Sequence, residues 1–329
     1  MTILVTGSAG HLGEALMRTL REAGRPALGL DIKASAFTDA VGSVADRAFV
    51  REAIAGVTAI IHSATLHKPH VATHPASDFI ETNVAGTLTL LEEAAAAKTS
   101  AFVFTSTTSA FGAALTPARG EPAAWITEDV PPVPKNIYGV SKTAAEALVE
   151  MIARRERLPV IILRTSRFFP EEDDNAEVRS RFPVLNAQAN EMLYRRGDIA
   201  DMVSAHLAAI ERAPAIGFGR HIVSATTPFT HDDLPALRNH AADVISRLFP
   251  EAAGLYAARK WSLPDGIDRV YVNAKARRDL DWTPRYDFAH VLACLKRGEN
   301  DFRSPLARAV GSKGYHDTVF ADGPYPVAS

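Results

Sequence analysis

Residues 6–13, Thr-Gly-Ser-Ala-Gly-His-Leu-Gly, decide the fold of this chain. They follow the short apolar run Ile3–Thr6, which is typical of a buried strand, and they open the amphipathic stretch Leu12–Ala23, which is typical of a helix. The three glycines permit a tight turn, a close approach of backbone N–H groups to an anion, and close packing of the helix on the strand. We therefore predict a strand–turn–helix unit whose helix N-terminus binds a phosphate group.

The alternation of strand and helix continues through the first half of the chain. Short runs rich in β-branched residues predict four more buried strands, and the stretches between them predict helices. Continuous apolar strands separated by helices indicate a parallel sheet covered on both faces, so the expected fold class is α/β with a doubly wound (Rossmann) sheet. The predicted strands are Ala27–Asp31, Ala59–His62, Ala101–Thr105 and Val160–Arg164, and the predicted helices are Ala45–Ala55, Phe79–Ala97 and Tyr138–Arg155.

An acidic residue ends the second predicted strand. Asp31 stands 18 residues beyond Gly13, and a carboxylate in this position accepts hydrogen bonds from the ribose hydroxyls of a dinucleotide. The same charge repels a 2′-phosphate, although Lys33, two places further on, could partly accommodate one. The sequence therefore predicts NAD as the cofactor in preference to NADP.

The regular pattern weakens after Arg164. The stretch Phe168–Arg181 is polar and acidic, Asp201–Arg212 has a helical pattern again, and the remainder is richer in proline and aromatic residues. We expect a smaller C-terminal substrate lobe, partly interleaved with the sheet domain, that closes over the site. The expected division gives residues 1–165 to the NAD-binding domain, with 195–225 returning to it, and residues 166–194 and 226–329 to the substrate-binding lobe.

The composition argues against several classes of partner. Hydrophobic residues make up 47% of the 329 residues and charged residues 22%, which is the balance of a globular chain. A net charge of −2 gives no support for a nucleic acid or an acidic membrane as partner. No run approaches the length of about 18 apolar residues that a membrane span needs, so we expect no membrane partner and a cytoplasmic location. The only cysteine, Cys294, cannot form an intrachain disulfide.

A tyrosine and a lysine four residues apart are the strongest candidates for catalysis. Tyr138 and Lys142 share one face of a predicted helix. A free phenol, with a pKa of about 10, is a poor base at neutral pH, whereas a nearby ammonium and an oxidised nicotinamide favour the phenolate. Tyr138 could then take a proton from a carbinol as hydride leaves, or return it to a carbonyl. Such pairs also occur by chance in helices. The prediction that Tyr138 and Lys142 are catalytic therefore depends on the dinucleotide-binding loop that precedes them in the sequence.

Hydroxyl side chains follow the fourth predicted strand. Residues 104–112 read Phe-Thr-Ser-Thr-Thr-Ser-Ala-Phe-Gly. A hydroxyl at the carboxyl end of this strand could hydrogen-bond the reacting oxygen and complement Tyr138. The alternative is that these hydroxyls only cap the strand end.

These motifs together resemble the extended short-chain dehydrogenase/reductase superfamily, and within it the NAD-dependent epimerase/dehydratase family. The Gly-x-x-Gly-x-x-Gly spacing, the Tyr-x-x-x-Lys pair and residues 104–112 are similar to its pattern, as are residues 56–65, Gly-Val-Thr-Ala-Ile-Ile-His-Ser-Ala-Thr, and residues 83–87, Asn-Val-Ala-Gly-Thr. The resemblance covers roughly the first half of the chain with specific motifs. It implies the family fold and a mechanism that uses Thr107, Tyr138 and Lys142 as catalytic residues, with Ser106 or Thr108 as alternatives to Thr107.

The resemblance also implies the residues around the cofactor. The loop after the strand at 59–62 would lie beside it, and the asparagine of the 83–87 motif would stabilise the active-site helix. Together with the glycine-rich loop, the expected NAD contacts are Gly7, Gly10, His11, Leu12, Gly13, Asp31, Ser43, Val44, Ser63, Ala64, Asn83, Ser106, Tyr138, Lys142 and Thr165.

Two segments depart from the family pattern. At the adenine-contact position the family has an acid, and Ser43 replaces it, which can still hydrogen-bond an amino group. In residues 163–170, Leu-Arg-Thr-Ser-Arg-Phe-Phe-Pro, Arg167 replaces the asparagine that helps hold a sugar nucleotide. Arg167, with Arg195 and Arg196, could receive a carboxylate or phosphate, and an ion pair with an acid in residues 171–174 is an equal alternative.

A histidine-rich segment follows the third predicted strand. Residues 67–74 read His-Lys-Pro-His-Val-Ala-Thr-His, and three histidines at this spacing could ligate a metal on a helix. Pro69 argues against a regular helix, so we expect no metal. The family uses this loop as a wall facing the substrate. The candidate substrate contacts are His67, Lys68, Thr108, Arg167 and Arg195.

The chain is therefore predicted to be an NAD-dependent oxidoreductase or epimerase that transfers a hydride at a carbinol or carbonyl carbon of a sugar or sugar-nucleotide-like substrate. The alternative is a net dehydrogenase or reductase of a small anionic hydroxy or keto compound, and a remote one is a non-catalytic NAD sensor. A dehydratase is disfavoured because Ser106 and Thr108, beside Thr107, are not acidic. Apolar residues beyond one face of the helices at 79–97 and 138–155 predict a homodimer, although a deeper monomer core explains the same pattern.

Overall fold

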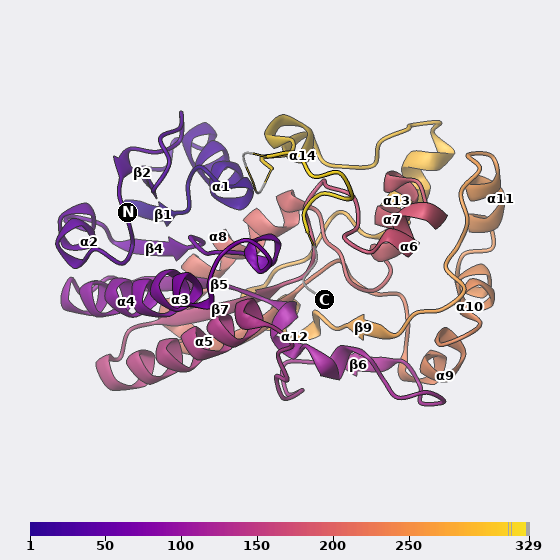
Figure 1. Cartoon of the computed structure of the whole chain (residues 1–329), viewed down its shortest axis with the longest axis horizontal. Helices are drawn as coiled ribbons and strands as arrows, with labels where there is room; N and C mark the ends of the chain where they lie inside the picture. Colours follow the sequence, from indigo (N-terminus) through magenta and orange to yellow (C-terminus); the bar gives the residue numbers. More distant parts are fainter. Residues whose placement is uncertain (315, 317, 327–329) are drawn as a thin grey trace.

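The computed structural model describes residues 1–314, 316 and 318–326. Seven strands form one sheet in the order β3-β2-β1-β4-β5-β7-β8, and every neighbouring pair runs parallel (Figure 1). The predicted α/β fold class with a doubly wound sheet is confirmed. The strands are β1 (Ile3–Thr6), β2 (Ala27–Asp31), β3 (Ala40–Val41), β4 (Ala59–His62), β5 (Ala101–Thr107), β7 (Val160–Thr165) and β8 (Phe218–Val223).

Alternate residues along the strands are buried in two separate hydrophobic cores, one on each face of the sheet, because successive side chains of a strand point to opposite faces. Ile3 and Val5 of β1 pack with α1 (His11–Glu22) and α8 (Ile199–Ile216) on one face of the sheet. Leu4 packs on the other face with α2 (Arg47–Ala53), α4 (Gly86–Ala96) and α5 (Ile137–Glu156). The sheet is thus buried on both sides, which explains the continuous apolar runs in the sequence.

The helix predicted at 79–97 is interrupted by a wider turn. It begins as α3 (Ala76–Phe79), passes through a π-helical segment, η2 (Ile80–Ala85), and continues as α4. A π-helical segment inserts one extra residue per turn and so turns the side chains that follow. Here the segment contains Asn83, which is 1% exposed.

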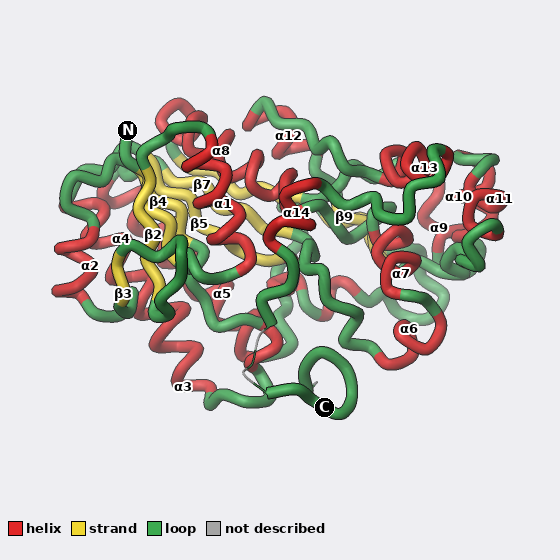
Figure 2. The backbone as a smooth tube through the Cα atoms, turned by 90° about the horizontal axis from the view of Figure 1, so that it is seen from above, coloured by secondary structure: helices red, strands yellow, loops and turns green. Residues whose placement is uncertain are grey.

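A second group of elements lies at the far end of the molecule (Figure 2). Strand β6 (Ala124–Ile126) pairs in parallel with β9 (Arg269–Tyr271), although the two strands lie far apart in the sequence, with Ala124 opposite Arg269. The helices around this pair share a third core that contains Leu237, Tyr256 and Phe288. These helices are α7 (Val184–Glu191), α9 (Leu234–Leu237), α10 (Ala241–Leu248), α11 (Ala252–Ala257) and α13 (Phe288–Lys296), and α6 (Ala176–Arg181) packs on α7 outside this core.

The chain crosses between the two groups several times. Strand β8 and helix α8, within residues 195–225, join the main sheet, whereas β6, within residues 1–165, pairs in the second group. Helix α12 (Ala274–Leu280) packs on α8, and α14 (Pro305–Val310) packs on α1. The exact division into domains stays a prediction. Within the described residues, no helix is both long and apolar enough to span a membrane.

Candidate active site at the switch point of the sheet

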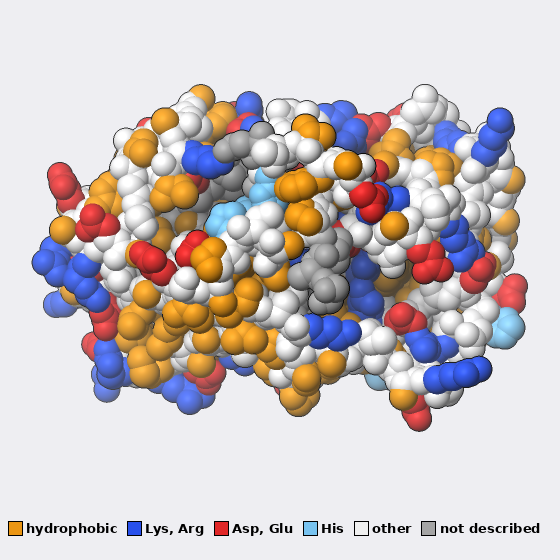
Figure 3. Space-filling view, in the orientation of Figure 1, with side chains coloured by type: hydrophobic (Ala, Val, Ile, Leu, Met, Phe, Trp, Pro, Cys, Tyr) orange, Lys and Arg blue, Asp and Glu red, His pale blue; other side chains and the backbone are white. Residues whose placement is uncertain are grey.

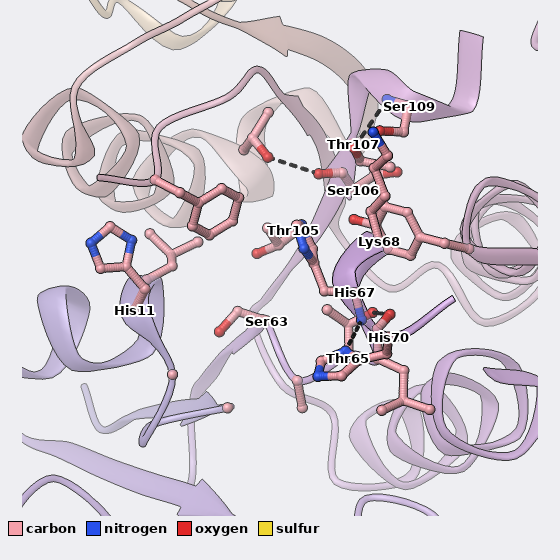
Figure 4. A pocket seen from close by; sticks show the side chains of 18 of the residues that line it. His11, Ser63, Thr65, His67, Lys68, His70, Thr105, Ser106, Thr107 and Ser109 are labelled. Carbon is pink, nitrogen blue, oxygen red and sulfur yellow. Dashed lines mark hydrogen bonds between the residues drawn. The ribbon is translucent and has the colours of Figure 1, made fainter. Parts of the chain in front are cut away.

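A cavity of about 1010 Å³ opens at the carboxyl ends of β1 and β4. Chain order runs outward from these two neighbouring strands in opposite directions, toward β2 on one side and β5 on the other. Such a reversal leaves a crevice between the loops that leave the two strands, and open α/β sheets bind ligands there. Figure 4 shows His11 on one side of the cavity and His67, Lys68 and Thr107 across from it.

The glycine-rich loop forms one end of the cavity. Gly7 has a φ of +75°, and a Cβ there would lie 2.8 Å from the backbone nitrogen of Ala64. A Cβ on Gly13 would overlap the carbonyl oxygen of Gly7. Helix α1 begins immediately afterwards, and its N-cap, Gly10, offers no side-chain cap to the first N–H groups of the helix. The loop therefore holds an uncapped helix N-terminus against open space, which suits a diphosphate.

His11 adds an unsatisfied donor at the same place. Its ring is 8% exposed, lines the cavity and stacks on Phe168 with centroids 5.8 Å apart. Neither ring nitrogen has a hydrogen-bond partner among the described residues. Burial lowers the pKa of His11 to about 4, so the ring is neutral at pH 7 and can donate one N–H. These orphaned nitrogens fit a ligand that brings acceptor oxygens.

Asp31 closes this end of the cavity. Its carboxylate accepts hydrogen bonds from the backbone N–H groups of Ala9, at 3.0 Å, and Lys33, at 2.9 Å. Both bonds fix the carboxylate at the end of β2, where ribose hydroxyls of a dinucleotide would reach it. The other expected contacts on this side also line the cavity: Gly7, Gly10, Leu12, Gly13, Ser43, Val44, Ser63 and Ala64.

Tyr138 lies across the cavity from this loop, at the start of α5. The Asn136 side chain caps the helix by accepting from the N–H of Gly139, at 3.0 Å, and so fixes its first turn. Tyr138 is 3% exposed, and it lines the cavity together with Thr107 at the end of β5. The structure therefore brings the predicted phenol and hydroxyl together in one cavity.

Lys142 lies behind the cavity wall. Its Nζ donates to the carbonyl oxygen of Thr105, at 2.7 Å, and lies 4.0 Å from the centre of the Phe104 ring. Lys142 is 2% exposed, and burial lowers its pKa to about 7, while the carboxylate of Glu146 opposes this change. The side chain is thus close to the reacting groups but is not part of the cavity surface.

The pKa of Tyr138 differs from the expectation. We expected the neighbouring ammonium to lower it, whereas burial raises the pKa of Tyr138 above its usual value, and the influence of the Thr107 side chain only partly opposes this. The reason is that α5 buries the phenol before any ligand contributes charge. An oxidised nicotinamide carries positive charge and would favour the phenolate when bound.

The side chains of Asn83 and Ser106 hold elements of the cavity wall together. Asn83 does not line the cavity, and its expected contact with NAD stays a prediction. Its side-chain amide accepts from the N–H of Leu66, at 2.8 Å, and donates to Ser141 Oγ, at 3.0 Å, so it ties the loop after β4 to α5. Ser106 lines the cavity, but its hydroxyl donates to the buried carboxylate of Glu146, at 2.6 Å.

Thr165 and Thr108 complete the wall beside β5. Both line the cavity. The hydroxyl of Thr165 donates to the carbonyl oxygen of Ser106, at 2.9 Å, so the end of β7 is held against β5.

The two arginines expected to contact the substrate, Arg167 and Arg195, form ion pairs with acidic side chains of the protein. Arg167 Nη1 lies 2.8 Å from Asp173 Oδ2, and Arg195 Nη2 lies 2.8 Å from the same oxygen. Arg195 also pairs with Glu191 of α7. The ion-pair alternative for Arg167 is therefore what the structure shows, because the acidic stretch after β7 folds back onto it.

The histidine-rich loop forms the wall opposite the cofactor loop. Residues Lys68–His70 form a short 3₁₀ turn, in agreement with Pro69 opposing a regular helix. The His67 ring lies 4.9 Å from the Tyr138 ring, and burial lowers the pKa of His67 to about 3. Lys68 pairs with Asp174. Among the described residues, no group of three or more His, Cys, Asp or Glu side chains could hold a metal ion.

Several residues of the cavity wall were not predicted from the sequence. They come from segments remote in sequence, and no motif marked them. They are Lys135 before α5, Arg269 and Tyr271 of β9, and Lys313, His316 and Tyr325 near the C-terminus. His316 contacts His70, with ring centroids 5.2 Å apart, and Figure 3 shows histidine side chains reaching the surface near the middle of this face.

Comparisons with known proteins agree with this geometry. The model of the NAD dependent epimerase/dehydratase family matches residues 3–223. A UDP-glucose 4-epimerase of Rhizobium leguminosarum bv. trifolii is 26% identical over 88% of this chain and 95% of its own length. A short-chain dehydrogenase/reductase superfamily protein from Agrobacterium tumefaciens, solved with bound NAD, has a TM-score of 0.62 at 23% identity, covering 94% of this chain and 99% of its own.

A second solved structure is similar over most of its length. The UDP-glucose 4-epimerase of Thermotoga maritima, solved with UDP-glucose, has a TM-score of 0.60 at 21% identity. The alignment covers 87% of this chain and 94% of that one. At this identity the likeness shows the fold.

Proposed function

The chain belongs to the NAD dependent epimerase/dehydratase family, and from that premise we propose that it transfers a hydride between NAD and a carbinol or carbonyl carbon of a sugar or sugar-nucleotide-like substrate. One observation carries the proposal. The Tyr138 phenol and the Thr107 side chain line the same cavity as the glycine-rich loop and Asp31, and Thr107 is close enough to Tyr138 to lower the pKa of its phenol.

The residues divide the work between two ends of the cavity. The N-terminus of α1, His11 and Asp31 would hold the diphosphate and ribose of NAD. The hydroxyls of Thr107 and Tyr138 would hold the substrate oxygen, so that Tyr138 removes or returns its proton as the carbon is oxidised or reduced. When bound, NAD supplies the carbon that accepts or donates the hydride. Lys142 would stabilise negative charge on Tyr138 from behind the wall.

The relatives support a sugar-nucleotide substrate. Both 4-epimerases named above carry UDP-glucose in their names, and an epimerase re-reduces the carbon it has oxidised and so keeps its cofactor. A net dehydrogenase or reductase of a small anionic hydroxy or keto compound is the second candidate. The non-catalytic NAD sensor is a remote third, because Tyr138, Thr107 and Lys142 all stand in one region of the site.

Two further expectations belong to this proposal. The chain would act in the cytoplasm, and two copies would form a homodimer through α4 and α5. The support for the dimer is the apolar surface on this side of the molecule.

The experiment follows NADH by absorbance, and formation of the epimer by chromatography, when purified protein and NAD meet UDP-sugars, free sugars and sugar acids. We expect Tyr138→Phe to lower the rate by about 10²–10⁴-fold, because proton transfer is lost while the ring stays. Tyr256→Phe is the matched control, since Tyr256 is also buried but lies in the core of the second group of helices. Net NADH production with a sugar would exclude a pure epimerase.

Unchanged rates in Tyr138→Phe would contradict the proposed mechanism. If NAD also altered the binding of that variant to a protein partner, the result would favour the non-catalytic NAD sensor.

A further inference from the structure

Most cationic side chains at the substrate end of the cavity form ion pairs with acidic side chains of the protein. Lys68, Arg167 and Arg195 are three cations of this wall. They are paired within the protein by three buried or nearly buried acids: Asp174 with Lys68, Asp173 with Arg167 and Arg195, and Glu191 with Arg195. Each of these three cations thus has at least one acidic partner, although Glu191 is shared with Arg196 and the buried Arg195 Nε has no acceptor in the described part of the structure.

Arg269 is the exception. It lines the cavity, and no hydrogen bond or ion pair of its side chain exists within the described part of the chain. Its Nε is buried and has no hydrogen-bond partner. Lys135, three residues before Tyr138, also lines the cavity without an acidic partner among the described residues, and it is exposed at the rim.

The register of β9 explains why Arg269 faces the cavity. Successive side chains of a strand point to opposite faces. Arg269 and Tyr271 both line the cavity, whereas Val270 between them is fully buried in the core of the second group of helices. Pairing of β9 with β6 fixes this register, with Arg269 opposite Ala124, so the guanidinium cannot turn into the core.

An unsatisfied, partly buried guanidinium has a physical cost. A buried donor without an acceptor loses the hydrogen bonds that water gave it in the unfolded chain. The planar fork of a guanidinium matches the oxygens of a carboxylate or a phosphate, and a ligand with such a group would recover this loss. An uncharged sugar hydroxyl would supply one acceptor and no charge.

We propose that Arg269, assisted by Lys135 at the rim, binds an anionic group of the substrate, either a carboxylate or a phosphate. This rests on the proposed function, because it takes the substrate to occupy the same cavity as Tyr138. The shared chemistry is two oxygens with negative charge. A sugar acid would present them on its ring, and a sugar nucleotide would present them on its diphosphate.

The test is calorimetric binding to the NAD-loaded protein with four probes: glucose, glucuronate, UDP and UDP-glucose. We expect Arg269→Ala to weaken binding of at least one anionic probe by about tenfold or more, the effect of losing a charged hydrogen-bonded partner. Arg269→Lys should keep part of the affinity, because it keeps the charge without the fork. If Arg269→Ala loses affinity only for UDP and UDP-glucose, the group that Arg269 binds is a diphosphate. If it loses affinity only for glucuronate, the group is a carboxylate.

The matched control is Arg277→Ala. Arg277 is an exposed arginine of α12 that does not line the cavity, so its removal changes the net charge equally. The proposal is wrong if Arg269→Ala binds every anionic probe as the unaltered protein does, if Arg277→Ala loses as much, or if no anionic probe binds more tightly than glucose.

This failure can be told from failure of the proposed function. NAD binding and Tyr138-dependent hydride transfer are measured separately. If the protein transfers hydride but Arg269→Ala leaves the affinity for every anionic probe unchanged, only the anion site is wrong. If no substrate shows Tyr138-dependent turnover, the proposed function is wrong.

Discussion

Glu146 shows how single residues set the chemistry of this site. It stands one helical turn beyond Lys142 on α5, and its carboxylate accepts from Ser106 Oγ, at 2.6 Å, and from Arg164 Nη2, at 2.8 Å. Glu146 therefore binds α5 to β5 and β7 and places a negative charge near the buried lysine. The sequence offered the Tyr-x-x-x-Lys spacing, but the acid that opposes the effect of burial on Lys142 became visible only in the structure.

The buried Lys142 makes stability depend on pH in a defined direction. Its pKa in the folded chain is about 7, below the usual 10.5, so between these values the unfolded chain binds more protons than the folded one. The cost of burying the charge is therefore fully present below pH 7 and is relieved as the pH rises toward 10.5. The folded chain should gain about 1.4 kcal/mol per pH unit from this residue within that window.

Lys142→Met tests this dependence. We expect the unfolding free energy, measured by urea denaturation between pH 7.5 and about 9.5, to rise with pH less steeply in Lys142→Met than in the unaltered chain. The control is Lys98→Met, which removes an exposed lysine. Identical slopes for the Lys142→Met and unaltered proteins would show that the ammonium is not suppressed by burial.

At the scale of elements, the glycine-rich loop is the part that the sequence specified most completely. The strand, turn and helix formed where the spacing placed them, because a Cβ at Gly13 would overlap the Gly7 carbonyl and the helix could not approach the strand. In contrast, the π-helical segment Ile80–Ala85 was read as ordinary helix, because a single-residue widening leaves the apolar pattern almost unchanged.

Gly13→Ala tests the packing of this element. We expect at least tenfold weaker NAD binding, because the added methyl group must push α1 away from the loop that holds the diphosphate. Gly254→Ala is the matched control: Gly254 lies in helix α11, and nothing lies within 4 Å of its Cβ position. That variant should keep NAD affinity and gain up to about 1 kcal/mol of stability.

Equilibrium NAD titration and thermal unfolding give both readouts for this pair. Equal NAD affinity in Gly13→Ala and Gly254→Ala would remove the glycine-rich loop as the cofactor site.

At the scale of the whole molecule, one face carries apolar side chains that a monomer leaves in water. Figure 3 shows them gathered over the region of α3, α4 and α5. Met151 of α5 is 43% exposed, and Ile80 at the start of the π-helical segment is 45% exposed. Apolar surface of this kind marks association sites, which supports the predicted homodimer.

Met151→Lys tests the dimer. A lysine in a packed apolar interface leaves a buried charge, so we expect a shift from dimer to monomer in analytical ultracentrifugation. Val184→Lys is the control, since Val184 is 41% exposed but lies on α7, away from α5. A monomer before any substitution, or a dimer that withstands Met151→Lys, would contradict the expected interface.

The sequence by itself determined the sheet, the cofactor loop and the placement of Tyr138 at the head of a helix. Each follows from local rules: strand period, the size of glycine, and the spacing of residues on one helix face. Only the tertiary structure decided which cations remain for a ligand. Arg167 pairs with an acid six residues away, and Arg269 reaches the cavity because β9 pairs with β6, so charge balance depended on contacts that no local pattern encodes.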